Sequence, residues 1–251
     1  MSRVYDRKIA INENSIQDFY AQRAIKKSSI DVDAPVVLAG DRDKNNIHAW
    51  TAFEVEHRLP ELQLQPSCKV LEVGCGTGRI TKYITSSVDH YVGIDYIEEF
   101  IETIKNREDI QKSENTSFYH ASLNDLTTRT LALPITRFNR FIISGGVFMY
   151  VNDEQVGAAI ETISSMLEDD SIIYISEPVA LQSRLTLDRF YSEDLHSEYS
   201  AIYRTEKEYE ALFAPFLKRG FKLTCSEEFF HHDIKKQKET KQWLFVLKKG
   251  V

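Results

Sequence analysis

The stretch Val70-Leu-Glu-Val-Gly-Cys-Gly-Thr-Gly-Arg-Ile80 decides the fold of this chain. Its first four residues are typical of a short buried strand, and a helical pattern starts at Gly78. The glycines between them predict a tight turn, because a residue without a Cβ lets the backbone approach a ligand closely. A strand, a glycine turn and a helix start together place backbone N–H groups around one ligand.

The spacing of the glycines indicates which ligand this is. Dinucleotide-binding proteins use G-x-G-x-x-G, whereas Gly74, Gly76 and Gly78 follow G-x-G-x-G, with Glu72 two positions ahead of the first glycine. This pattern resembles motif I of the class I S-adenosylmethionine (SAM) methyltransferases. The resemblance implies that SAM is held by Glu72, Gly74, Cys75, Gly76 and Gly78. The alternative is an ordinary strand-to-helix turn.

Composition and charge narrow the class of protein. The chain has 251 residues, a formal net charge of −7 and three cysteines without zinc or disulfide spacing. No apolar run reaches the about 20 residues of a membrane helix, no signal peptide is apparent, and no basic stripe suits nucleic acid. We expect a cytoplasmic, metal-independent protein with a small-molecule substrate and with neither nucleic acid nor a membrane as partner. A homodimer stays open as its assembly.

After residue 66, strand and helix patterns alternate, which predicts βαβ units and a mostly parallel sheet. The expected strands cover 69–73, 90–94, 116–120, 140–144, 171–176, 222–228 and 242–247. The expected helices cover 78–86, 97–107, 153–167 and 205–216. The last two strands have no helix between them and should form a hairpin. The expected fold class is α/β, a doubly wound, mostly parallel seven-stranded sheet that ends in an antiparallel hairpin, with an N-terminal helical lid.

The N-terminal segment, 1–66, is expected to cap a domain that spans 67–251. Its helical patterns lie at 14–27 and 43–64. Several members of the resembled family cover SAM with an aromatic residue of a lid helix and bind its carboxylate with an arginine. Tyr20 and Arg23 are the candidates for these roles. A core aromatic and a surface arginine are the alternative.

Asp95 ends the second predicted strand, 21 positions after Gly74. An acidic residue about 20 positions beyond the glycine turn reaches the ribose hydroxyls in doubly wound folds. With the resemblance, this spacing implies that Asp95 binds the ribose of SAM and that Tyr96 packs on the adenine.

The loops after the next two strands complete the implied cofactor site. The first contains Ser122, Leu123 and Asn124, in a region that holds the adenine in the family. Family members often have Asp where this chain has Ser122, so the polar contact is left open among Ser122, Asn124 and Asp125. The second loop begins with Ser144 and Gly145, which the resemblance places beside the methionine part of SAM.

Candidate acceptor-binding residues lie further along the chain. The catalytic candidates are His196, Tyr150, where many family members have His, and Glu177. An insertion at about 178–204 carries substrate specificity in the family, and its arginines and aromatics suit a phosphorylated or sugar-bearing substrate. A plain amphipathic helix is the alternative. The candidate substrate residues are Arg184, Arg189, Tyr203, Arg204, His231 and His232.

The expected function is transfer of a methyl group from SAM to a small polar metabolite, first of all to a hydroxyl of a sugar or a sugar-nucleotide-like intermediate. Two alternatives are kept: N-methylation of a small amine, and a non-catalytic module that binds SAM and regulates a partner. A NAD-dependent dehydrogenase is disfavoured by the glycine spacing.

Overall fold

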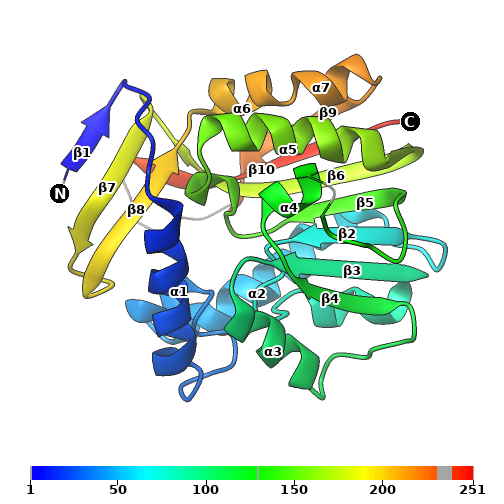
Figure 1. Ribbon diagram of the computed structural model, residues 1–251, viewed down its shortest axis with the longest axis horizontal. Helices are drawn as coiled ribbons and strands as arrows, with labels where there is room; N and C mark the ends of the chain where they lie inside the picture. Colours follow the sequence, from blue (N-terminus) through cyan, green and yellow to red (C-terminus); the bar gives the residue numbers. More distant parts are fainter. Residues whose placement is uncertain (1, 129, 231–238, 251) are drawn as a thin grey trace.

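The larger sheet follows the alternation expected from the sequence. The computed structural model describes residues 2–128, 130–230 and 239–250. Within them this sheet has seven strands in the order β4-β3-β2-β5-β6-β10-β9 (Figure 1). Neighbours from β4 to β6 are parallel, whereas β10 is antiparallel to β6 and β9. The strand bounds, in this order, are Thr116–His120, His90–Asp95, Lys69–Val73, Phe138–Ile143, Leu167–Ala180, Thr240–Lys248 and Lys222–Glu228.

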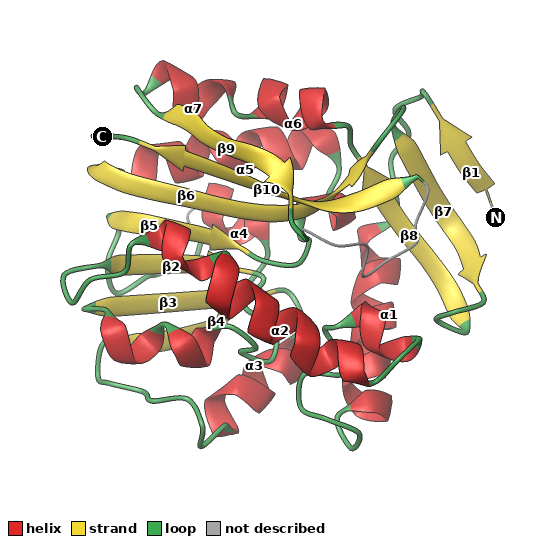
Figure 2. Ribbon diagram, turned by 180° about the vertical axis from the view of Figure 1, so that it is seen from behind, coloured by secondary structure: helices red, strands yellow, loops and turns green. Residues whose placement is uncertain are grey.

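Helices cover both faces of this sheet, which is why its inner strands β2, β3 and β5 are buried along almost their whole length. Leu71 and Val73 of β2 point into one core and Val70 into the other. Helices α4 to α7 cover the first face, and α2 and α3 cover the second (Figure 1, Figure 2). The bounds of α2 to α7 are Asn45–His57, Glu98–Asn106, Leu123–Thr128, Asp153–Met166, Glu206–Leu212 and Ala214–Lys218. The predicted doubly wound fold with a terminal antiparallel hairpin is confirmed.

The N-terminal helix α1 (Glu13–Lys27) contacts β8 and α3. The side chain of Asn12 caps the helix by accepting a hydrogen bond from the Asn14 N–H at 3.1 Å. Ile16 and Phe19 are buried on its inner side. Among the described residues, no helix combines the length and the apolar character needed to cross a membrane. Short 3-10 helices lie at Leu38–Asp41, Leu59–Leu62 and Phe148–Tyr150.

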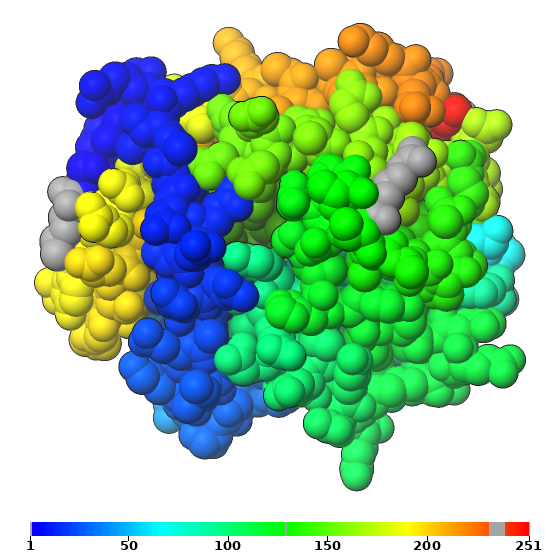
Figure 3. All heavy atoms as spheres, in the orientation of Figure 1, coloured from blue at the N-terminus to red at the C-terminus, as the bar shows by residue number. Residues whose placement is uncertain are grey.

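The insertion forms part of a second sheet, so the amphipathic helix considered for it is wrong. Strands β7 (Leu185–Ser192) and β8 (Ser197–Tyr203) make an antiparallel hairpin. Strand β1 (Ser2–Tyr5), from the start of the chain, pairs with β7, and the N-terminal segment lies beside the hairpin (Figure 3). The first three residues of β7, Leu185 to Leu187, are all buried, whereas the strand becomes more exposed after the register shift between Leu187 and Phe190.

Two expected helices differ in the structure. Residues 78–86 form 3-10 turns at Thr81–Tyr83 and Thr85–Ser87 instead of an α-helix. β-Branched residues are frequent there and lower the helix propensity. The helix expected over 205–216 is divided into α6 and α7 at Phe213, because Pro215 cannot continue the hydrogen-bond ladder of an α-helix.

Gly78→Ala should lower the free energy of unfolding by about 2 kcal/mol. The φ of Gly78 is +89°, and an added Cβ would lie 2.6 Å from Cδ1 of Ile110. Urea denaturation measures the change. Gly157→Ala in α5 is the matched control: its added Cβ would meet nothing within 4 Å, so stability should rise by about 0.5–1 kcal/mol. Equal effects of the two substitutions would contradict the role given to Gly78.

Candidate active site

A cavity of about 910 Å³ lies where the parallel strands β2, β3 and β5 end, between the larger sheet, α1 and the β7–β8 hairpin. Ligands bind at this edge in open α/β sheets, because the loops that follow the strands meet there. One part of the cavity, the glycine-turn end, is lined by Glu72, Gly74, Cys75, Gly76, Asp95, Tyr96, Ile97 and Leu123. The other part, the tyrosine end, is lined by Tyr20, Tyr150, Leu187, Tyr199 and Tyr203.

The glycine turn is a cradle that only glycine can form. Gly74 and Gly76 have φ values of +74° and +55°. A Cβ on Gly74 would lie 2.3 Å from Cγ2 of Val147, and one on Gly76 would lie 2.9 Å from Cγ1 of Val36. Gly78 does not line the cavity; it packs against the side chains of Ile104 and Ile110. Its part in the site is therefore to set the path of the turn.

Asp95 lies in the wall of the cavity, as its position at the end of β3 suggests. Its carboxylate accepts hydrogen bonds from the backbone N–H groups of Gly76 at 2.8 Å and Ile97 at 2.9 Å. Burial raises the pKa of Asp95 to about 6, while these hydrogen bonds oppose the rise. Asp95 thus joins the glycine turn to the loop after β3, and each carboxylate oxygen keeps further acceptor capacity.

The loop after β4 brings Ser122, Leu123 and Asn124 to the cavity wall. The Ser122 hydroxyl donates a hydrogen bond to Oδ2 of Asp125 at 2.8 Å. The Ser122 N–H donates to the same oxygen, and these hydrogen bonds lower the pKa of Asp125. Of the three alternatives for a polar contact, Ser122 and Asn124 therefore line the cavity, while Asp125 organises the loop.

A buried arginine that the sequence did not single out lies beside the glycine turn. Arg79 lines the cavity and donates hydrogen bonds to Oε2 of Glu54 at 2.6 Å and to the Ser144 hydroxyl at 2.9 Å. Glu54, which is 0% exposed, also accepts hydrogen bonds from Ser144 and Tyr174. The arginine directly after the third glycine was the available signal. Ser144 and Gly145 also line the cavity.

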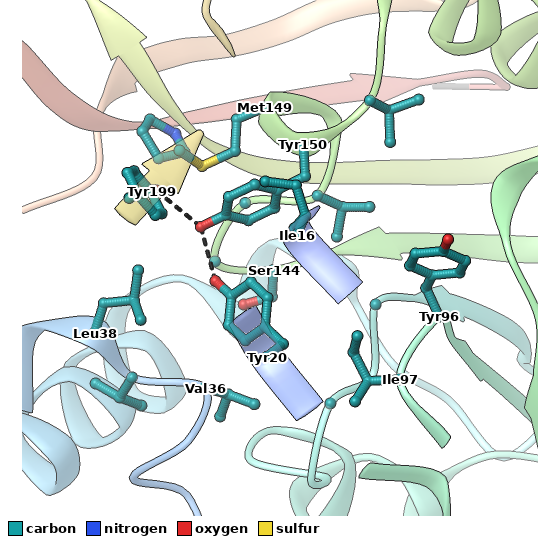
Figure 4. A pocket seen from close by; sticks show the side chains of 18 of the residues that line it. Ile16, Tyr20, Val36, Leu38, Tyr96, Ile97, Ser144, Met149, Tyr150 and Tyr199 are labelled. Atoms are coloured by element: carbon teal, nitrogen blue, oxygen red, sulfur yellow. Dashed lines mark hydrogen bonds between the residues drawn. The ribbon is translucent and has the colours of Figure 1, made fainter. Parts of the chain in front are cut away.

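Tyrosine hydroxyls form a chain at the other end of the cavity. Tyr20 of α1 donates to Tyr150 at 2.7 Å, and the hydroxyls of Tyr150 and Tyr199 lie 3.0 Å apart (Figure 4). Tyr203 continues the chain at 3.5 Å from Tyr199. Burial raises the pKa of Tyr20 to about 12 and those of the other three above their usual value. All four are therefore neutral near pH 7 and can both donate and accept hydrogen bonds.

The structure places two catalytic candidates outside the cavity. Glu177 is 0% exposed and does not line it. Its carboxylate accepts hydrogen bonds from the backbone N–H groups of Val147, Phe148 and Met149, and burial raises its pKa. It holds the loop that carries Tyr150. His196 is exposed in the β7–β8 turn, where its φ is +50°.

Three candidate arginines serve the fold instead of lining the cavity. Arg23 donates to the carbonyl groups of Ala34 and Pro35 and pairs with Asp41 at 2.5 Å. Arg184 and Arg204 are buried and both pair with Asp153 at the start of α5. None of these three side chains lines the cavity, so none is placed to contact a ligand in it.

Of the remaining substrate candidates, one lines the cavity, one does not, and two lie outside the described residues. Arg189 is exposed on β7 and does not line the cavity. Tyr203 lines it, as expected. His231 and His232 lie outside the described residues.

Glu72 gives the site a pH dependence. It is 1% exposed, accepts hydrogen bonds from Tyr91 and Thr81, and burial raises its pKa from 4.5 to about 7. The folded state thus binds this proton more tightly than the unfolded state. Its contribution to stability is complete below about pH 4.5 and is lost as the pH rises through about 7.

Between pH 4.5 and 7, the free energy of unfolding of the wild type should fall as Glu72 loses its proton. Glu72→Gln should remove at most about 3 kcal/mol of this fall. Chemical denaturation at several pH values measures this, with the wild type as reference. Asp95 titrates in the same range but is present in both proteins, so the difference isolates Glu72. Parallel pH curves would contradict a raised pKa for Glu72.

This chain resembles known proteins in sequence and in fold. The family model described as "Methyltransferase domain" matches residues 64–247. Phosphoethanolamine N-methyltransferase 1 of Triticum aestivum is 33% identical over 137 residues, which are 52% of this chain and 26% of that protein. The chain spans about a quarter of the length of the first curated relatives that it matches.

Two solved structures have the same fold. One is Haemonchus contortus phosphoethanolamine N-methyltransferase 1 with phosphoethanolamine and S-adenosylhomocysteine (SAH): TM-score 0.66, 18% identity, covering 95% of this chain and 49% of that one. The other is a DhpI–SAH complex: TM-score 0.61, 16% identity, covering 95% and 97%. Since the family model spans most of the chain, including the glycine turn and Asp95, this protein belongs to the methyltransferase domain family and is a SAM-dependent methyltransferase with the class I fold.

Proposed function

We propose that this protein transfers the methyl group of SAM to the nitrogen of a small amine. The observation that carries the proposal is the tyrosine end of the cavity, with its chain of neutral hydroxyls. A hydroxyl acceptor needs a base placed against it, and the described residues that line the cavity include no histidine. An amine that has lost one proton carries its own lone pair and needs only alignment.

The charge of the cavity also favours an amine. Among the residues that line the cavity away from the glycine turn, the carboxylates of Glu13, Glu193, Asp194 and Glu239 outnumber the two arginines, Arg3 and Arg42. A surplus of carboxylates attracts cations. The faces of Tyr20 and Tyr150 can in addition stabilise a methylated ammonium by cation–π attraction. The Triticum and Haemonchus relatives are both named as methyltransferases of an amine.

The cofactor fits the glycine-turn end. We assign the ribose to Asp95, the adenine to the space between Ile97 and Leu123, and the methionine carboxylate to Arg79. Arg79 replaces Arg23 in this role, because it lines the cavity and Arg23 does not. SAM, when bound, supplies a methyl group that is already activated as a sulfonium. Tyr20 and Tyr150 then enclose the acceptor nitrogen and exclude water from it.

Arg79→Lys should weaken SAH binding about tenfold, since lysine keeps a cation next to Glu54 but lacks the fork that grips a carboxylate. Binding of 5′-methylthioadenosine, which has no amino acid tail, should not change. Titration calorimetry measures both ligands. Arg23→Lys is the control and should affect both ligands equally. Equal losses of both ligands in Arg79→Lys would show that Arg79 only supports the fold of the pocket.

Tyr150→Phe should lower kcat for an amine acceptor about tenfold and leave SAH affinity unchanged, because it breaks the hydroxyl chain at the acceptor. His196→Ala, on the exposed turn, should change neither. The assay is transfer of labelled methyl to paired acceptors that carry either an amine or only hydroxyls. Transfer to the hydroxyl compounds alone would overturn N-methylation. SAH binding without transfer to any acceptor would favour a regulatory module.

A further inference from the structure

The N-terminal strand β1 supplies a cation to the acceptor part of the cavity. Arg3 lines the cavity although it lies at the start of the chain, because β1 pairs with β7 and places Arg3 opposite Leu187. The Arg3 guanidinium lies 5.4 Å from the centre of the Phe190 ring, which also lines the cavity. Aromatic contact of this kind holds the long side chain against the cavity wall and leaves its N–H groups able to donate hydrogen bonds.

The chain of tyrosine hydroxyls runs from helix α1 toward Arg3. Its first member, Tyr20, belongs to α1, and its last member, Tyr203, belongs to β8. Burial raises the pKa of Tyr203, and the charge of Arg3 opposes that rise, so the guanidinium acts on this hydroxyl. The two ends of the space proposed for the acceptor therefore differ. The end near the cofactor carries neutral tyrosine hydroxyls, and the far end carries the cation of Arg3.

We infer that Arg3 is a specificity-determining residue that binds an anionic group, a phosphate or a carboxylate, on the far side of the amine acceptor. This inference rests on the N-methylation proposed above and names the substrate class, an amine with an acidic group. Arg3 and the Tyr203 hydroxyl together would supply the charge-assisted and neutral hydrogen bonds that such a group accepts.

To bind such an anionic group, Arg3 would exchange its present ion pair with Glu239. The two side chains form an ion pair, and the Tyr5 hydroxyl donates to Oε1 of Glu239 at 2.9 Å. The side chains of Arg3 and Glu239 are 36% and 50% exposed. Exposed pairs contribute little to stability, so an acceptor anion can replace Glu239 while water and Tyr5 continue to solvate its carboxylate.

The second cavity arginine does not fit this role as well. Arg42 donates two hydrogen bonds to the same carboxylate oxygen of Asp194. Each of these two side chains is 45% exposed. They join the segment after the first 3-10 helix to the β7–β8 turn, whereas Arg3 contacts the Phe190 ring in the cavity wall. Arg42 therefore serves as a comparison for Arg3.

The test measures acceptor binding to SAH-loaded protein by calorimetry, with methyl transfer assayed in parallel. Phosphoethanolamine carries a phosphate, glycine carries a carboxylate, and ethanolamine carries neither. Arg3→Met should weaken binding of the preferred anionic amine at least tenfold and change ethanolamine binding less than twofold. Glu239→Gln should strengthen anionic-amine binding relative to ethanolamine. Arg7→Met, an exposed arginine of the same segment outside the cavity lining, and Arg42→Met should leave the ratio unchanged.

The outcomes separate this inference from the proposed function. Phosphoethanolamine and glycine distinguish a phosphate subsite from a carboxylate subsite by which one loses affinity in Arg3→Met. Wild-type protein that binds neither more tightly than ethanolamine, or Arg3→Met that keeps the wild-type preference, overturns the role of Arg3 even if amines are methylated. Absence of transfer to every amine, with binding still dependent on Arg3, would overturn N-methylation and leave an anion subsite.

Discussion

The site depends on the backbone hydrogen bonds between the glycine turn that follows β2 and Ile94 of β3. The N–H groups of Gly74 and Cys75 both donate to the carbonyl of Ile94, at 2.8 and 3.1 Å. This contact fixes the glycine turn against the end of β3, and it requires a positive φ at Gly74 beside Val147. Asp95, the next residue on β3, then reaches back to the turn through Gly76. The glycine-turn end of the cavity is therefore set by backbone geometry, with side chains added to it.

Buried charge in this protein mostly holds loops in place. Glu177 accepts hydrogen bonds from three backbone N–H groups of the loop that carries Tyr150, and Asp153 joins Arg184 and Arg204 of the insertion to the start of α5. These side chains are close to the cavity in space without lining it. Because an uncompensated buried charge is costly, such ion pairs set the positions of the catalytic segments with little freedom.

The larger sheet and the residues that line the glycine-turn end of the cavity were predictable from the sequence because both arise from local patterns. Apolar runs, glycine spacing and an acid at the end of β3 are each read within a few residues. The roles of Arg23 and Arg79 were not predictable, since an arginine looks the same whether its partner is Asp41 or a ligand. The strand β1 could not be foreseen either, because four residues pair with a segment that is remote in sequence.

That remote pairing has a consequence for the order in which the molecule assembles. Ser2 lies opposite Asp188, so this contact closes a loop that contains most of the chain, and such closure is entropically expensive. The larger sheet, built from neighbouring βαβ units, closes shorter loops, so we expect it to form before this contact. The β1–β7 pairing, which carries Arg3 to the cavity, should then be late to form and early to open by local unfolding.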